Sequence, residues 1–130
     1  MIAYVRTIEG SFALELEEEQ LLGPADDPVP ELVELSLPRL VAASAAGSTV
    51  IALVDRRPPL LVSNDSGSTW REAGGGLPPG FAVAIDPEDP DRVLFAARNR
   101  LYLSTNGGLF WRGLEPELPD IEAVGWATEP

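Results

Sequence analysis

The sequence predicts an all-β chain built from a repeated unit of about 41 residues. The segment Ser63–Trp70 recurs as Ser104–Trp111, displaced along the chain by 41 residues. The apolar triplet before it, Leu60–Val62, recurs in the same register as Leu101–Leu103. A fixed period that combines strand-like and turn-like segments indicates a repeated β unit and not a one-off enzyme fold.

Leu-Pro pairs mark the start of each unit, at Leu37-Pro38, Leu77-Pro78 and Leu118-Pro119. Proline cannot donate a hydrogen bond to a strand ladder, so it suits the entry to a strand. A short apolar run follows each pair, and runs of this length favour strands over helices. First strands are therefore expected at Leu40–Ala43, Phe81–Ile85 and Ile121–Ala127.

Further strands follow in the first two units. A Gly-Ser turn leads into Thr49–Val54, and the acidic turn Asp86–Asp91 leads into Arg92–Ala97. β-Branched residues bounded by Gly, Pro and Asp are typical of strands between turns. A third strand precedes each copy of the motif, and Trp70 and Trp111 open a short fourth. Four antiparallel strands per unit are the content of a β-propeller blade.

The third unit is divided between the two ends of the chain. Ile121–Ala127 supplies only a first strand, whereas Ile2–Val5 and Phe12–Leu14 resemble the second and third strands of the other units. Glu15–Gln20 stands where the motif would be, and its residues have diverged. The alternating Glu31–Leu35 is expected to be the fourth strand.

A helix over Ser11–Leu22 is the alternative for part of this unit, because Leu and Glu favour helices. The alternation of Phe12, Leu14 and Leu16 favours a strand instead. The chain is then one module over residues 1–130. Its blades are residues 121–130 with 1–36, residues 37–76 and residues 77–120.

Three blades do not close a ring, since propellers typically have about 4–8. Open blades leave strand edges that invite pairing with another chain. We expect two chains to form a six-bladed homodimer by exchanging strands between their termini, in line with the prevalence of two-fold symmetry. A compact monomer whose termini pair within one chain is the alternative.

The charge balance limits the classes of molecule that this chain is expected to bind. With 21 acidic residues against 9 basic ones and a net charge of −12, binding to nucleic acid or to an anionic membrane is disfavoured. The sequence has no Cys and no His, which removes disulfides, thiolate nucleophiles and the commonest general base and metal ligand. The first residues do not form a signal peptide and no apolar run is long enough to span a membrane, so a cytoplasmic location is expected.

The repeated motif resembles a known one. Ser63–Trp70 matches the pattern Ser-x-Asp-x-Gly-x-Thr-Trp of the Asp-box, or BNR repeat, at every defining position. The second copy is similar to it, with Asn106 in place of Asp and Phe110 in place of Thr. Proteins with this box include sialidases, sortilin-type receptors and photosystem assembly factors. The resemblance covers roughly residues 37–127 and implies a β-propeller.

In these families the boxes are hairpins that lie away from the active site, so the resemblance implies a structural role. An Asp side chain can accept hydrogen bonds from turn N–H groups, Gly supplies a positive φ, and Trp buries a large apolar surface. The candidate residues of the two hairpins are Ser63, Asp65, Gly67, Thr69, Trp70, Ser104, Asn106, Gly108 and Trp111.

Other features predict no catalytic centre, cofactor or metal site. Arg56-Arg57 reads as a solvated turn that could contact an anion, and Asp86–Asp91 lacks the full pattern of a Ca²⁺ loop. A sialidase needs a Tyr–Glu nucleophile pair and an Arg triad, yet Tyr4 and Tyr102 are the only tyrosines. We therefore expect a non-catalytic binding or scaffold module for a protein or glycan ligand, with a carbohydrate-active protein as the alternative.

Overall fold

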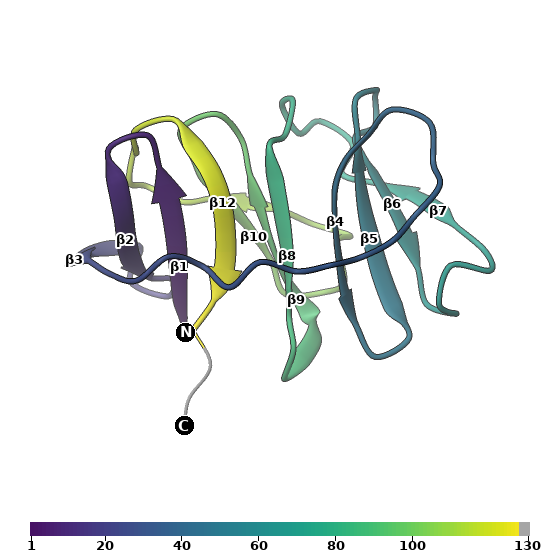
Figure 1. Cartoon of the computed structure of the whole chain (residues 1–130), viewed down its shortest axis with the longest axis horizontal. Helices are drawn as coiled ribbons and strands as arrows, with labels where there is room; N and C mark the ends of the chain where they lie inside the picture. The colour runs from purple at the N-terminus through teal and green to yellow at the C-terminus, as the bar shows by residue number, and fades with distance from the viewer. Residues whose placement is uncertain (128–130) are drawn as a thin grey trace.

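The computed structural model describes residues 1–127, and these form strands and their connections only. Three four-stranded antiparallel sheets make up the fold (Figure 1). This confirms the predicted all-β architecture of four-stranded units. Within residues 1–127 no helix is long and apolar enough to cross a bilayer.

Two of the sheets follow the chain in order. The lateral sheet contains β4 (Leu40–Ala46), β5 (Thr49–Val54), β6 (Leu60–Ser63) and β7 (Arg71–Ala73). The central sheet contains β8 (Ala82–Asp86), β9 (Asp89–Ala96), β10 (Leu101–Ser104) and β11 (Arg112–Gly113). In both sheets each strand pairs with the next strand along the chain.

The terminal sheet is built from both ends of the chain, as the sequence predicted. Its order is β12 (Ile121–Trp126), β1 (Ile2–Thr7), β2 (Gly10–Glu15) and β3 (Gln20–Pro24). β12 and β1 are antiparallel, and Ala127 N donates to Ile2 O over 2.9 Å where the pairing ends. Both strands belong to one chain here.

The fourth strand of the terminal sheet was predicted wrongly. It is β3 and not Glu31–Leu35, which forms no strand. Leu21 pairs with Leu14 directly after a tight turn, so the sheet is complete before the Pro-rich loop begins. The helix alternative for Ser11–Leu22 is also wrong, because strands β2 and β3 occupy this segment.

The acidic turn is shorter than predicted. β8 extends to Asp86 and β9 already begins at Asp89, with a register shift between Ile85 and Asp86. Pro90 and Asp91 therefore belong to the strand.

The central sheet holds the fold together by packing on both of its faces. One face packs Leu94 and Leu101 against Val5 and Leu14 of the terminal sheet. The other face packs Phe95 against Leu53 and Leu60 of the lateral sheet. Face-to-face packing of amphipathic sheets removes their apolar sides from water, which is the main stabilising term in such a fold.

Side-chain hydrogen bonds also connect the first strands of neighbouring sheets. Ser44 Oγ on β4 accepts from Ile85 N on β8 over 2.8 Å, and Trp126 Nε1 on β12 donates to Ala84 O over 3.0 Å. β8 is an edge strand of its sheet, so these backbone groups have no strand partner on that side. An unsatisfied buried polar group costs about 1–3 kcal/mol, and both contacts avoid that cost.

A long connection crosses the side of the molecule where β12, β8 and β4, the first strands of the three sheets, lie; we call this the open side. Residues 25–39, here called the crossing segment, run from β3 past β12 and β8 to β4 (Figure 1). Pro28 lies against Gly125, and the carboxylate of Glu31 accepts from Ser44 Oγ at 2.8 and 3.0 Å. The corresponding connections into β8 and β12, residues 74–81 and 114–120, are about half as long.

Gly80 provides a test of the packing between the central and lateral sheets. A Cβ atom there would lie 2.6 Å from the ring of Phe95 and 2.9 Å from Leu53. We expect Gly80→Ala to destabilise the fold by about 1–3 kcal/mol, the usual cost of overpacking. Gly75→Ala is the matched control, since nothing lies within 4 Å of its added Cβ. Urea unfolding of both variants measures the difference; equal midpoints would contradict the packing described here.

Candidate functional site

The two predicted hairpins have the same hydrogen-bonded geometry. Asp65 Oδ1 accepts from Ser63 Oγ at 2.7 Å and from Thr69 N at 2.8 Å, and Asp65 Oδ2 accepts from Thr69 Oγ1 at 2.6 Å. Ser63 Oγ accepts from Gly67 N over 2.8 Å, and Gly67 has a φ of 93°. The polar side chains are thus engaged within their own turn.

The second hairpin reproduces these contacts with an amide. Asn106 Oδ1 accepts from Ser104 Oγ at 2.9 Å and from Phe110 N at 3.0 Å. Ser104 Oγ accepts from Gly108 N over 2.9 Å. The contact from a Thr hydroxyl has no counterpart, because Phe110 replaces that residue.

The two tryptophans differ in their surroundings. Trp111 Nε1 donates to Gly108 O, and the indole makes an edge contact with Phe95 at a centroid distance of 6.0 Å. Trp111 therefore packs against the core between the central and lateral sheets. Trp70 is half-buried and lines a shallow pocket with Asp65 and Thr69.

Hydrogen bonds from Thr69 and Ser63 lower the pKa of Asp65 from 3.8 to about 2, and the Thr69 hydroxyl is the largest cause. A carboxylate that is stabilised in its charged form suits a fixed acceptor and not a general acid at neutral pH. Asp65 acts as a structural acceptor in this turn.

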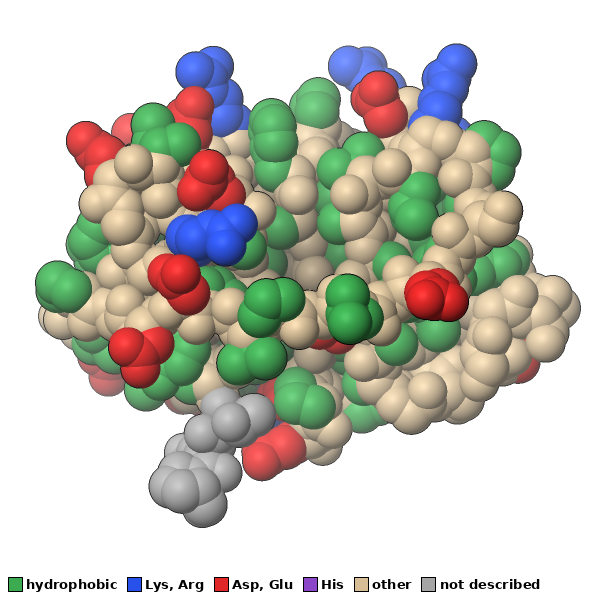
Figure 2. All heavy atoms as spheres, in the orientation of Figure 1, with side chains coloured by type: hydrophobic (Ala, Val, Ile, Leu, Met, Phe, Trp, Pro, Cys, Tyr) green, Lys and Arg blue, Asp and Glu red, His purple; other side chains and the backbone are tan. Residues whose placement is uncertain are grey.

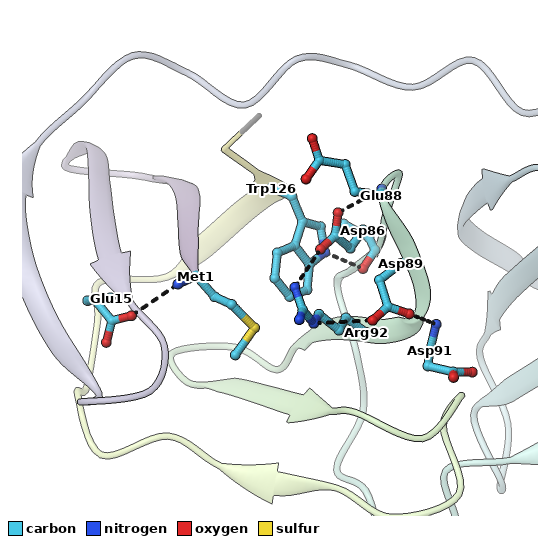
Figure 3. A network of polar contacts seen from close by, with 9 residues as sticks. Met1, Glu15, Asp86, Glu88, Asp89, Asp91, Arg92 and Trp126 are labelled. Atoms are coloured by element: carbon cyan, nitrogen blue, oxygen red, sulfur yellow. Dashed lines mark hydrogen bonds and ion pairs between the residues drawn. The ribbon is translucent and has the colours of Figure 1, made fainter. Parts of the chain in front are cut away.

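Two carboxylates of the acidic turn between β8 and β9 share one arginine (Figure 3). Arg92 lies 3.6 Å from Asp86 and 3.4 Å from Asp89. The same two carboxylates accept from the backbone N–H groups of Glu88 and Asp91. In the part of the chain that the structure describes, no group of three or more acidic side chains is placed to hold a metal ion.

A groove lies at the end of the sheets opposite the two hairpins. Three adjoining hollows, the largest of about 830 Å³, share Pro78 and Pro79. Tyr102 lines two of them, and Arg57 and Pro59 line two. The groove is enclosed by the β5–β6 loop, the connection into β8 and the β9–β10 loop. Rigid proline rings and an aromatic side chain give the groove a preorganised apolar wall, beside the charged and polar residues that also line it.

Arginines surround this apolar wall (Figure 2 shows arginine side chains at the upper end of the molecule). Arg98 pairs with Asp120 at 3.2 Å, and Arg100 pairs with Glu117 at 3.3 Å. Arg56 and Arg57 are exposed and form no ion pair within residues 1–127. They are the groove cations available to a ligand.

Sequence reasoning noted Arg56-Arg57 but did not find the groove. Pro78 and Tyr102 were assigned to strand entry and to a strand, because a single sequence does not reveal that their units meet at one end. Two Pro-Pro pairs, Pro58-Pro59 and Pro78-Pro79, are the sequence feature that could have indicated the groove, since each lies close to a strand end. The predicted hairpin residues lie at the other end and do not contribute to the groove.

Comparison with known proteins supports a propeller-type fold. YCF48 bound to a D1 peptide superposes with a TM-score of 0.52 at 15% identity, over 91% of this chain and 37% of that one. A GH74 enzyme of Niastella koreensis gives 0.49 at 18% identity, over 85% of this chain and 17% of that one. Both are β-propeller proteins, and the similarity to YCF48 together with the three four-stranded sheets gives this chain a propeller-type fold. The chain spans well under half of the length of either protein. No protein-family model and no curated protein matches the sequence.

Asp65 generates a test of its role in the hairpin. Asp65→Ala removes every contact of the carboxylate and is expected to lower Tm by roughly a few degrees. Asp65→Asn keeps an amide oxygen, as Asn106 does naturally, and should lower Tm less. Calorimetry of both variants checks this order, and an unchanged Tm in Asp65→Ala would contradict it.

The lowered pKa of Asp65 also predicts a pH dependence. A depressed folded-state pKa stabilises the fold above the ordinary value of 3.8, and that contribution disappears as the pH falls through about 2. The Tm difference between the wild type and Asp65→Asn should therefore be largest above pH 4 and shrink towards pH 2. A difference that stays constant over this range would show that the charge of Asp65 has no role.

Proposed function

We propose that this chain is a non-catalytic propeller-type binding module whose groove holds an acidic segment of a partner protein. The proposal rests on one observation: the exposed Arg56 and Arg57, which form no ion pair within residues 1–127, lie beside the apolar wall of Tyr102 and Pro78-Pro79. Guanidinium groups bind carboxylates in a bidentate manner, and Tyr and Pro surfaces bind extended chain segments.

The net charge of −12 does not oppose this assignment. At physiological ionic strength the screening length is about 8 Å, so distant carboxylates act weakly on a ligand in the groove. The nearby carboxylates of Asp120 and Glu117 are compensated by Arg98 and Arg100. The exposed carboxylate of Asp55 lines the same hollow as Arg56 and Arg57, so these three groups leave a net charge of one positive unit at the groove.

The hairpins support a scaffold role and not chemistry. We propose that both are Asp-boxes, in which Asp65 and Asn106 organise the turn and do not face a substrate. Their side-chain oxygens already accept two or three hydrogen bonds each within the hairpin. The similar structure of YCF48 is described as bound to a D1 peptide, an example of a protein of this fold that binds a peptide.

A peptide titration tests the proposal. Fluorescein-labelled peptides of about twelve residues, rich in Glu and Pro with one Tyr, are compared with versions in which Lys replaces Glu. We expect saturable binding of the acidic peptide, weakened by salt, and none of the basic one. Arg56→Ala combined with Arg57→Ala should weaken binding about 10- to 100-fold, the loss expected for hydrogen bonds to a charged group.

Arg71→Ala is the matched control, because Arg71 is an exposed arginine outside the groove that contacts Gly107 O. It should leave peptide affinity unchanged. Equal binding of both peptides, or equal loss in the control, would refute the groove as an anion site. Turnover of fluorogenic glycosides would instead favour the carbohydrate-active alternative.

A further inference from the structure

The lateral sheet has one face that lacks the cover its repeat counterpart has. In the central sheet, Phe95, Tyr102 and Trp111 pack on the side that meets the lateral sheet. The period of 41 relates Tyr102 to Leu61 and Trp111 to Trp70. Leu61 lies between Leu60 and Val62, which face the central sheet, so it points to the other side. Within residues 1–127 no sheet covers that side.

The terminal sheet has the complementary gap. Val5 and Leu14 face the central sheet, so Tyr4, Ala13 and Ala123 face away from it. Within the chain, the central sheet separates these two uncovered faces. The partner that fits each face is therefore the other kind of sheet, supplied by a second molecule.

A different side of the molecule, the open side where β12, β8 and β4 lie, is crossed by the crossing segment (Figures 1 and 2). It is held by Pro28 on Gly125, by Glu31 on Ser44 and by the bond from Asp55 N to Arg39 O. Its Val29 and Leu32 are 83% and 98% exposed, and beside it Val41 and Phe81 are about half exposed. The crossing segment thus leaves apolar side chains of its own and of the strands beneath it in contact with water, which makes it an incomplete cover.

The length of the crossing segment is compatible with a second arrangement of the chain. Connections between adjacent sheets need the seven or eight residues of 114–120 and 74–81, whereas the crossing segment has fifteen. Fifteen residues can return across three sheets, and they can equally connect to an adjacent sheet with length to spare.

We propose that two copies of this chain close a six-sheet ring by exchanging β1–β3, so that β12 of one molecule pairs with β1 of the other. The exchange re-forms the same backbone pairs, including Ala3 with Trp126, so its cost is small. The gain comes from sheet-on-sheet packing between the uncovered face that carries Leu61 and Trp70 in one molecule and the uncovered face that carries Tyr4 in the other. The crossing segment then connects neighbouring sheets and leaves the ring's interior.

A disulfide trap tests the exchange. Arg6 and Ala123 are directly paired on β1 and β12, where Cα separations suit a disulfide, and the sequence has no native Cys. Arg6→Cys combined with Ala123→Cys, oxidised at low protein concentration, should migrate as a covalent dimer on a non-reducing denaturing gel. Either single variant is the control and should not form the paired species.

Light scattering of the unmodified chain gives the mass in solution. We expect twice the single-chain mass, and we expect Leu61→Glu to reduce it to that of one chain. Leu109→Glu is the matched control, since Leu109 is 65% exposed on a hairpin tip, and it should remain dimeric. A single-chain mass for the wild type, or a disulfide formed only within one chain, overturns the proposal.

Discussion

The pairing of β12 with β1 is the constraint on which the rest of the structure depends. It joins the two ends of the chain in one sheet and places Ile121 and Val124 in the core against the central sheet. Without β12, β1 would be an edge strand, and one face of the central sheet would lose part of its cover. The crossing segment follows from the same constraint, because the chain must travel from the terminal sheet to the far side of the central sheet before β4 begins.

A second consequence concerns the inner edge of the central sheet. β8 has one unpaired side, and its Ile85 N and Ala84 O are satisfied by side chains from two different sheets. Ser44 also donates to Glu31, so one hydroxyl links the crossing segment, the lateral sheet and the central sheet. Polar contacts of this kind fix how the sheets are oriented, whereas the apolar clusters supply most of the stabilisation.

The sequence predicted the parts of the fold that have a strong local signal. The β-branched run Thr49–Val54 after its Gly-Ser turn and the divided third unit were both read correctly, because composition and repeat period can be read directly from the sequence. The strand expected at Glu31–Leu35 was wrong, because alternation alone does not distinguish a strand from an extended segment that binds across other strands. The groove was missed for a related reason, since Arg57 and Tyr102 are far apart in sequence and meet only through the packing of two repeats.

The diverged third hairpin explains what the motif must preserve. Glu15 Oε2 accepts from Glu18 N over 2.7 Å, as Asp65 Oδ1 accepts from Thr69 N, and this bond is the largest cause of the lowered pKa of Glu15. Glu19 takes a φ of 54°, in a turn that contains no glycine. A carboxylate that accepts a turn N–H is thus retained although the residue type and spacing have changed. In each of the three sheets, a side-chain oxygen accepts a hydrogen bond from a backbone N–H group in the turn between the third and fourth strands. The repeated sequence pattern is one of several ways to provide this oxygen.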